Sequence, residues 1–166
     1  MSELNDLPDD ALLERLQRGA FDYFAACTNA QNGLVADTSR PASPCSIAVV
    51  GFALSCYPIA VERGWLTRAA AASITRTTLE FFRGSAQSER PDATGYRGFY
   101  YHFLDMQHGG RVWNCELSLI DTALLLAGML VSATYFDGDG IEAEIRATAD
   151  ALYRRVDWPW ALNGHD

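Results

Sequence analysis

The sequence predicts an all-α fold built from helical hairpins. Apolar residues recur every three to four positions in five segments of the 166-residue chain, the spacing that gathers them on one face of a helix. Two of these segments, 46–63 and 118–136, are apolar almost all round, and each is followed by a segment with a single apolar face, 67–83 and 141–156. Buried helices that alternate with half-exposed ones indicate an inner and an outer layer, as in an α/α toroid. A plain helical bundle fits the same periodicity and stays open as the alternative.

The composition fits one globular domain and excludes several classes of partner. A chain of this length normally forms a single domain, and its 49% of hydrophobic residues supply a core. The formal charge is −8, all 13 basic residues are arginine and no basic run occurs, so we expect neither nucleic acid nor a membrane surface as a partner. The four cysteines are widely spaced among apolar residues, which predicts buried thiols and no metal site. No nucleotide-binding fingerprint occurs, and no cofactor is expected.

The first expected helix spans residues 8–26. Pro8 suits the first helical position, and the apolar residues after it recur at helical spacing, which predicts an amphipathic helix with one buried face. These apolar residues are Leu12, Leu13, Leu16, Ala20, Phe21 and Phe24. The loop at 29–45 follows and contains Asp37 and Arg40. These two either pair with each other on the surface or belong to a site, because this loop leads into the next helix.

The second and third helices carry signals at their ends. The second, at 46–63, contains Pro58, which we expect to kink it, and Gly64 suits the position just beyond its C-terminus. The third, at 67–83, begins after Thr67, whose hydroxyl group is a suitable N-cap.

A long loop at 85–116 separates the third helix from the fourth. Loops of this length are uncommon unless they are functional or disordered, and the many Tyr, Phe and Trp residues argue against disorder. Residues 99–103 and 111–113 are the arms of an expected short β-hairpin across 107–110. Because binding and catalytic groups gather on loops held by a rigid scaffold, we place the candidate site here.

Two carboxylates near the start of the fourth helix are the candidate catalytic residues. Glu116 and Asp121 lie five positions apart, which turns them about 140° from each other on a regular helix. They share a cleft only if Glu116 lies on the loop before the helix. Each has a structural alternative: Ser118 and Asp121 match a capping box, and Glu116 is equally suited to pairing with Arg111 on the surface.

The loops also carry groups suited to binding a sugar. Aromatic rings with polar tips match the apolar faces and hydroxyl edges of sugar rings, although local packing accounts for such rings equally well. His102 with Asp105 has the form of a general base and its orienting carboxylate. The candidate substrate-binding residues are Asp37, Arg40, Tyr100, Tyr101, His102, Asp105, Arg111 and Trp113.

Six motifs carry a family resemblance. In chain order they are GLVADTSR, SIAVVGFAL, the turn VERGW at 61–65, GFYYHFLDM, RVWNCELSLIDTALLLAG and EIRATADALYRRVDWPW. Together they resemble the bacterial glucoamylase-like glycoside hydrolases, a family that includes endo-β-1,2-glucanases. The resemblance runs from about residue 13 to the last residue, and it does not fix the substrate.

The resemblance implies an α/α toroid of the six-hairpin type, with a cleft at one end walled by loops such as 37–40 and 98–116. It implies hydrolysis of a β-glucan with inversion, by a general acid and a general base about 6.5–9.5 Å apart. Glu116 and Asp121 match the family's segment and are the expected catalytic carboxylates, neither being assigned as acid or base. A six-hairpin ring needs two helices per hairpin and only five helices are expected here, so the chain corresponds to the N-terminal part of such a catalytic domain.

Alternatives to an active hydrolase follow from the incomplete ring. Inner helices without neighbours would expose apolar surface, which favours self-association or pairing with a chain that completes the ring. The alternative function is a non-catalytic helical fragment or a glycan-binding or assembly module. A polysaccharide lyase with Tyr101 or His102 as its base is less well supported, because no cationic cluster is present to hold a uronate. The first ten residues lack the basic and apolar regions of a signal peptide, so a cytoplasmic location is expected.

Overall fold

The computed structural model describes residues 7–163. This part of the chain contains five long helices, one short helix and five short strands. The helices are α1 (Asp9–Cys27), α2 (Ile47–Glu62), α3 (Arg68–Gly84), α4 (Leu119–Tyr135), α5 (Ile141–Arg155) and α6 (Trp158–Ala161). The strands are β1 (Cys45–Ser46), β2 (Gly95–Tyr96), β3 (Phe99–Tyr101), β4 (Phe103–Leu104) and β5 (Leu117–Ser118). The expected helical class is therefore confirmed, and the strands come from the loops.

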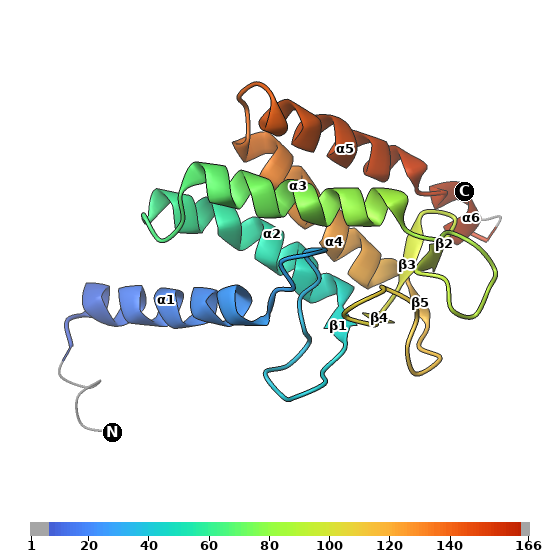
Figure 1. The fold of residues 1–166 in the computed structure, drawn as a ribbon, viewed down its shortest axis with the longest axis horizontal. Helices are drawn as coiled ribbons and strands as arrows, with labels where there is room; N and C mark the ends of the chain where they lie inside the picture. Colours follow the sequence, from blue (N-terminus) through green and yellow to red (C-terminus); the bar gives the residue numbers. More distant parts are fainter. Residues whose placement is uncertain (1–6, 164–166) are drawn as a thin grey trace.

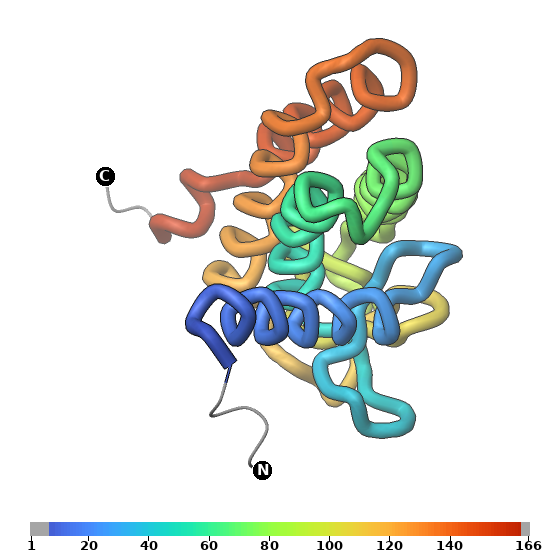
Figure 2. The backbone as a smooth tube through the Cα atoms, turned by 90° about the vertical axis from the view of Figure 1, so that its left-hand side faces the viewer, coloured from blue at the N-terminus to red at the C-terminus, as the bar shows by residue number. Residues whose placement is uncertain are grey.

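The long helices form two layers. α2 and α4 lie side by side in the centre, α3 packs on α2, α5 packs on α4, and α3 and α5 touch each other (Figures 1 and 2). Buried residues occur on several sides of α2, whereas in α3 and α5 they follow one face. The alternation of inner and outer helices expected from the hydrophobic pattern is confirmed, and each layer buries the apolar face of the other.

Two glycines allow the inner helices to approach closely. A Cβ atom added at Gly51 would lie 2.4 Å from the carbonyl oxygen of Leu124, and one added at Gly128 would lie 2.1 Å from the carbonyl oxygen of Gly51. Both distances are far below ordinary van der Waals contact. The crossing of α2 and α4 therefore requires glycine at both positions.

Pro58 lies inside α2, where it leaves a carbonyl group without its usual donor. Proline has no N–H, so the carbonyl oxygen of Leu54, one turn earlier, receives no helical hydrogen bond from position 58. The hydroxyl group of Ser132 on α4 donates a hydrogen bond of 2.8 Å to this oxygen. Because Ser132 is fully buried and water does not reach the site, the hydroxyl group supplies the donor that a buried carbonyl group needs.

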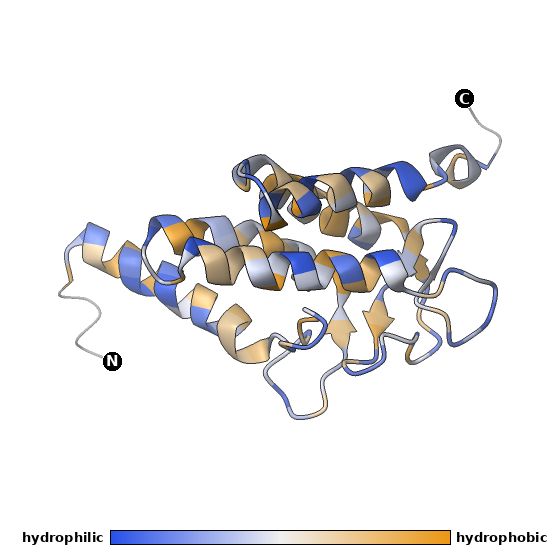
Figure 3. Ribbon diagram, turned by 45° about the horizontal axis from the view of Figure 1, so that its top comes forward, coloured by the Kyte–Doolittle hydropathy of each residue, from blue (hydrophilic) through white to orange (hydrophobic). Residues whose placement is uncertain are grey.

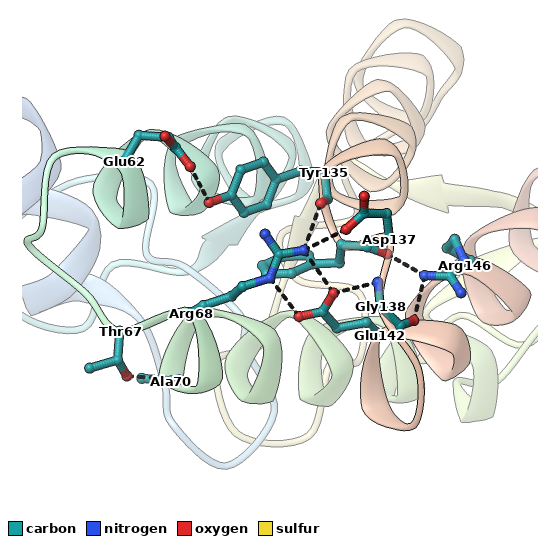
Figure 4. Close-up of polar contacts among 10 residues, drawn as sticks. Glu62, Thr67, Arg68, Ala70, Tyr135, Asp137, Gly138, Glu142 and Arg146 are labelled. Atoms are coloured by element: carbon teal, nitrogen blue, oxygen red, sulfur yellow. Dashed lines mark hydrogen bonds and ion pairs between the residues drawn. The ribbon is translucent and has the colours of Figure 1, made fainter.

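Arg68, the first residue of α3, connects this helix to the turn between α4 and α5 (Figure 4). Its guanidinium donates to both carboxylate oxygens of Glu142, at 2.7 and 2.8 Å. It also donates to the carboxylate of Asp137 at 2.9 Å and to the carbonyl oxygen of Tyr135 at 3.0 Å. Two parallel hydrogen bonds between guanidinium and carboxylate form a strong contact, and this contact is the main reason that the pKa of Glu142 falls to about 2. Thr67 caps the same helix end, as expected.

The short strands gather at the end of the molecule where α2 and α4 begin (Figure 1). β3 lies between β2 and β5 in one antiparallel sheet, and β1 pairs with β4 in another. The long loop contains a hairpin, as expected, with an antiparallel bridge between Leu104 and Arg111, but residues 99–101 of the expected first arm pair with β2 and β5 instead. The amide of Asp105 closes it with a hydrogen bond of 2.8 Å to the carbonyl oxygen of Gly110. The strands hold the long loop against the first turns of both inner helices.

The expectation of buried thiols is wrong for three of the four cysteines. Only Cys45 on β1 is fully buried, and burial raises the pKa of its thiol to about 12. Cys27, Cys56 and Cys115 are half-buried. The sulfur of Cys115 accepts a hydrogen bond of 3.2 Å from the amide of Phe103, which fastens the segment before α4 to β4.

The first helix buries only part of the apolar face expected for it, since Leu12 and Phe24 are half-buried. Phe21 is the one buried residue of α1, while Leu13 and Leu16 are 55% and 60% exposed. The first turns of α1 extend past the other helices (Figure 1), so little covers their apolar side chains, although Glu14 pairs at 2.8 Å with Arg63, the residue that follows α2. Apolar positions follow both inner helices (Figure 3), and some of them are exposed, including Phe52 and Ile120. None of the described helices is long and apolar enough to cross a membrane.

A candidate active site around His102

The site is built where the two small sheets meet the inner helices. His102 lies between β3 and β4, and its backbone is fixed on both sides. Its amide donates to the carbonyl oxygen of Glu116 at 3.1 Å, and its own carbonyl oxygen accepts a hydrogen bond of 3.2 Å from the amide of Ile47, the first residue of α2. His102 is therefore attached both to the segment before α4 and to the first turn of α2.

The imidazole of His102 lies between two carboxylates. Its Nδ1 atom is 2.8 Å from Oε1 of Glu116, and its Nε2 atom is 3.6 Å from Oδ2 of Asp121. One face of the ring stacks on Phe103, with ring centres 3.8 Å apart and planes 14° apart. Contacts in the plane of the ring and on its face leave the imidazole a single orientation.

Asp121 is both part of a helix cap and part of this cluster. The hydroxyl group of Ser118, the N-cap of α4, accepts a hydrogen bond of 3.2 Å from the amide of Asp121 and donates one of 2.6 Å to its Oδ2 atom. The capping interaction expected from the sequence is thus present. The same carboxylate oxygen faces His102, and only 14% of the Asp121 side chain is exposed. The cap therefore positions Asp121 within the site.

Glu116 is the carboxylate that reaches solvent. It precedes β5, and 64% of its side chain is exposed. Its own backbone amide, the imidazole of His102 and the more distant charge of Arg111 all favour the ionised form and lower the pKa of this carboxyl group. In this structure Glu116 is therefore a carboxylate at neutral pH.

Glu116 and Asp121 do not have the separation expected of an inverting pair. One oxygen of each lies within 4.8 Å of the other, whereas inverting glycosidases keep their carboxyl groups about 6.5–9.5 Å apart to admit a water molecule. The imidazole of His102 occupies the space between them. The nearest oxygens of the two groups are thus closer together than an inverting pair requires, and the assignment of Glu116 and Asp121 as catalytic carboxylates stays a prediction.

Hydrogen bonding accounts for the same three side chains without a metal ion. Within residues 7–163, His102, Glu116 and Asp121 are the one group of three such side chains whose donor atoms lie close enough together to share an ion. Both ring nitrogens of His102 face carboxylates, however, and Asp121 already accepts a hydrogen bond from Ser118. An imidazole that ligates a metal presents a lone pair to the ion and donates its other N–H outward. We therefore assign the cluster to hydrogen bonding.

Trp113 forms one wall of a groove beside the cluster. It is 71% exposed, and it and Asn114 both have positive φ angles, of 57° and 51°. Such conformations are unfavourable for residues other than glycine and are frequent at functional sites. The indole packs against Phe103 at 5.2 Å, on the ring that also contacts His102. The groove has a volume of about 290 Å³ and is lined by Ala42, Ser43, Pro44, Asp105, Met106, Gln107, Val112 and Trp113.

Two further predicted binding residues lie beside this groove. The guanidinium of Arg111 lies 4.3 Å from the ring centre of Tyr101 and donates a hydrogen bond of 2.7 Å to the carbonyl oxygen of Asn114. Arg111 thus supports the strained segment that presents Trp113, rather than pairing with Glu116 through a direct hydrogen bond. Tyr101 is half-buried beneath it.

Tyr100 is part of the core and does not contact substrate, contrary to the prediction. It is 1% exposed, and its hydroxyl group donates to the carbonyl oxygen of Phe82 at 3.3 Å and is hydrogen-bonded to Arg155. The ring of Tyr100 packs edge-on against Phe82 in the core, with ring centres 4.9 Å apart.

Asp105 does not orient His102, which is a second correction. One oxygen of Asp105 accepts hydrogen bonds from the amides of Gln107 and His108, at 3.0 and 2.7 Å, and shapes the tip of the loop. Glu116 and Asp121 take the place predicted for it. The stacking of Phe103 on His102 was missed, because the chain leaves one sheet and enters another between β3 and β4 and neighbouring side chains then meet.

Asp37 and Arg40 are not an ion pair in the part of the chain that the structure describes. The amide of Asp37 donates a hydrogen bond of 2.7 Å to the carbonyl oxygen of Pro44, next to the groove wall, and Arg40 is exposed at the tip of the loop. The expectation of a surface pair is therefore wrong, and membership of the site stays a prediction for both residues.

Comparison with known proteins supports the family resemblance. No family model matches the chain. An exo-β-1,2-glucooligosaccharide sophorohydrolase acting at the non-reducing end, from Parabacteroides distasonis, is 26% identical over 93% of this chain and 21% of its own length. This chain therefore spans about a fifth of the length of that curated relative.

Solved structures show the same fold. The β-1,2-glucanase of Parabacteroides distasonis superposes with a TM-score of 0.84 at 23% identity, over 96% of this chain and 23% of the other. The endo-β-1,2-glucanase of Chitinophaga pinensis, in complex with sophorotriose and glucose, superposes with a TM-score of 0.82 at 20% identity, over 95% of this chain and 39% of the other. Likeness at this level of identity establishes the helical fold and leaves the chemistry to the residues of the site.

Proposed function

We propose that this chain, similar in sequence and fold to part of the glucoamylase-like glycoside hydrolases, supplies one wall of the active-site cleft of an enzyme that hydrolyses β-1,2-linked glucan. The observation that carries the proposal is Glu116: an exposed carboxylate that is held by the half-buried imidazole of His102, near an exposed tryptophan that packs on Phe103. The relative named for action on β-1,2-glucooligosaccharides supports the choice of linkage. An uncharged glucan also suits a chain whose formal charge is −8.

The geometry gives the residues different tasks. Trp113 offers an indole face on which a glucose ring can stack. In this proposal Glu116 exchanges a proton with the glycosidic oxygen or with the attacking water. When the bond between C1 and that oxygen breaks, the oxygen leaves with a proton and water adds its hydroxyl group to C1. Inversion then requires a second carboxyl group on the far side of the sugar, a position that Asp121 does not hold.

The test separates binding from hydrolysis. The purified chain is incubated with β-1,2-linked glucose oligomers, and the anomeric configuration of any product is followed by NMR spectroscopy. Glu116→Gln should abolish turnover, because the amide can neither give nor take the proton, while Glu80→Gln, at an exposed position on α3, should retain it. Hydrolysis that survives Glu116→Gln would refute the role of Glu116.

Substrate contact in the groove has its own readout. The indole N–H signal of Trp113 should shift when a β-1,2-linked glucose trimer is added, and Trp113→Ala should weaken binding. Stacking of a nucleobase on an aromatic side chain is typically worth about 1–3 kcal/mol. Taking the same order for a glucose ring, we expect the affinity to fall about tenfold or more. Trp160→Ala is the matched control, since this residue is also partly exposed but lies on α6.

A glycan-binding module without activity is the second candidate. The short separation of Glu116 and Asp121 favours it, because the described residues then hold one carboxylate in position for catalysis. Binding of the trimer without turnover would support this second function. The exposed apolar residues of α1, α2 and α4 further suggest a partner or a second copy that completes the ring, and a concentration-dependent sedimentation coefficient would reveal self-association.

A further inference from the structure

We propose that His102 is a positioning residue for Glu116, holding its carboxylate in one orientation and controlling when it takes up a proton. The proposal rests on the proposed function only for its catalytic meaning, because the relation between the two side chains is a property of the folded chain. The proposal gives Asp121 a similar positioning role, with His102 as the residue that it positions. Asp121 positions His102, and His102 positions Glu116.

A backbone hydrogen bond holds His102 and Glu116 next to each other, whatever rotamers their side chains adopt. His102 and Glu116 are joined by a hydrogen bond of 3.1 Å between the amide of the first and the carbonyl oxygen of the second, in addition to the 2.8 Å contact between their side chains. An exposed glutamate normally samples several rotamers at small cost. Two contacts between the same two residues remove most of that freedom, which is the requirement for a group that must meet a bound sugar in one geometry.

Counting protons shows why the imidazole controls the charge. A neutral imidazole carries one N–H, so it can donate to Glu116 or to Asp121, and its other nitrogen then directs a lone pair at a carboxylate oxygen. A protonated imidazole donates at both nitrogens and leaves the cluster with one net negative charge. Nδ1 lies at hydrogen-bond distance, 2.8 Å, from a carboxylate oxygen of Glu116, whereas Nε2 is 3.6 Å from Asp121, beyond an ordinary hydrogen bond. The closer of the two contacts of the imidazole is therefore the one to Glu116.

The charged groups around the pair act in known directions. Arg111, from the hairpin arm, adds to the effect of His102 in favouring the carboxylate form of Glu116. Asp121, from α4, is the other charged group that faces the imidazole, with its Oδ2 atom 3.6 Å from Nε2 of His102. Arg111 is already engaged with Asn114, so removing the imidazole leaves Glu116 without a hydrogen-bond donor from any described side chain.

The test measures the protonation of Glu116 directly. The carboxyl carbons of glutamate are labelled with ¹³C in the 166-residue chain, and the Glu116 signal, assigned from Glu116→Gln, is followed by NMR spectroscopy as the pH changes. His102→Phe keeps an aromatic ring on Phe103 and removes both nitrogens. We expect the titration midpoint of Glu116 to move to higher pH in this variant. His108→Phe, in the same loop, is the matched control and should leave the midpoint unchanged.

A second variant protects the test against a folding defect. His102→Gln can still donate one hydrogen bond but carries no charge, so its midpoint should lie between those of the parent chain and His102→Phe. Circular dichroism identifies any variant that fails to fold. Equal Glu116 midpoints in the parent chain and in the folded His102 variants would overturn the proposal.

This readout does not depend on turnover. A chain that hydrolyses nothing can still show the shifted midpoint, which would support the role of His102 and count against the proposed function alone. Conversely, loss of hydrolysis in Glu116→Gln with identical midpoints in all His102 variants would support the function and refute the positioning role. If the chain hydrolyses glucan, His102→Gln should retain part of the rate. The part of its pH–rate profile that depends on the ionisation of Glu116 should move to higher pH.

Discussion

Replacing Ser132 with alanine removes the one side-chain donor that compensates for Pro58 inside α2. The hydroxyl group of Ser132 donates at 2.8 Å to the carbonyl oxygen of Leu54, and proline at position 58 cannot supply the usual helical donor. Because Ser132 is fully buried, water can reach the carbonyl oxygen of Leu54 in the alanine variant only if the contact between α2 and α4 opens. The free energy of unfolding should therefore fall by about 1–3 kcal/mol, the cost of a buried polar group without a partner.

A double-mutant cycle tests the cause of this loss. Pro58→Ala restores an N–H at position 58, which can donate to Leu54, so Ser132→Ala should be much less destabilising in that background. The expected coupling is about 1 kcal/mol or more, measured from urea unfolding followed by circular dichroism, and a loss of about 2 kcal/mol corresponds to a midpoint about 1 M lower. Ser55→Ala is the control, because its hydroxyl group donates to the carbonyl oxygen of Gly51, which keeps its helical donor. The same loss from Ser132→Ala in both backgrounds, within about 0.5 kcal/mol, would refute the reasoning.

Three further predictions concern charge, packing and the core. The pKa of Glu142 in the folded chain, about 2, lies below its ordinary value of 4.5. Its contact with Arg68 therefore stabilises the chain above about pH 4.5, and this contribution is lost as the pH falls towards 2. Glu142→Gln should make the free energy of unfolding less dependent on pH in that window, and an unchanged dependence would contradict the prediction. Gly128→Ala places a Cβ atom 2.1 Å from the carbonyl oxygen of Gly51 and should destabilise by about 1–3 kcal/mol or more, seen as a lower thermal midpoint. Tyr100→Phe should lower the free energy of unfolding by about 1–2 kcal/mol, because its hydrogen bonds are lost, while glycan binding stays the same. Weaker glycan binding by the folded variant would show that Tyr100 does contribute to the substrate site.

The helices and their layers could be predicted from the sequence because each depends on local pattern. Helical spacing of apolar residues located all five long helices within a few residues, and Thr67 and Ser118 marked two helix starts through interactions that reach only three residues along the chain. Alternation of buried and half-exposed helices predicted the two layers. Failure came where burial depended on distant neighbours, since Leu13 on α1 has the right spacing but little beside it to pack against.

The candidate site divides in the same way. Composition and motif order predicted a site in the loop before α4, and the sequence singled out Glu116, Asp121 and His102 as separate candidates. Only the tertiary structure decided that these three meet, that Asp105 caps its own loop, and that Tyr100 points inward. Each of these outcomes depends on which strands pair and where the chain passes from one sheet to the other. Contacts between residues far apart in sequence follow from packing of the whole chain, which local periodicity does not encode.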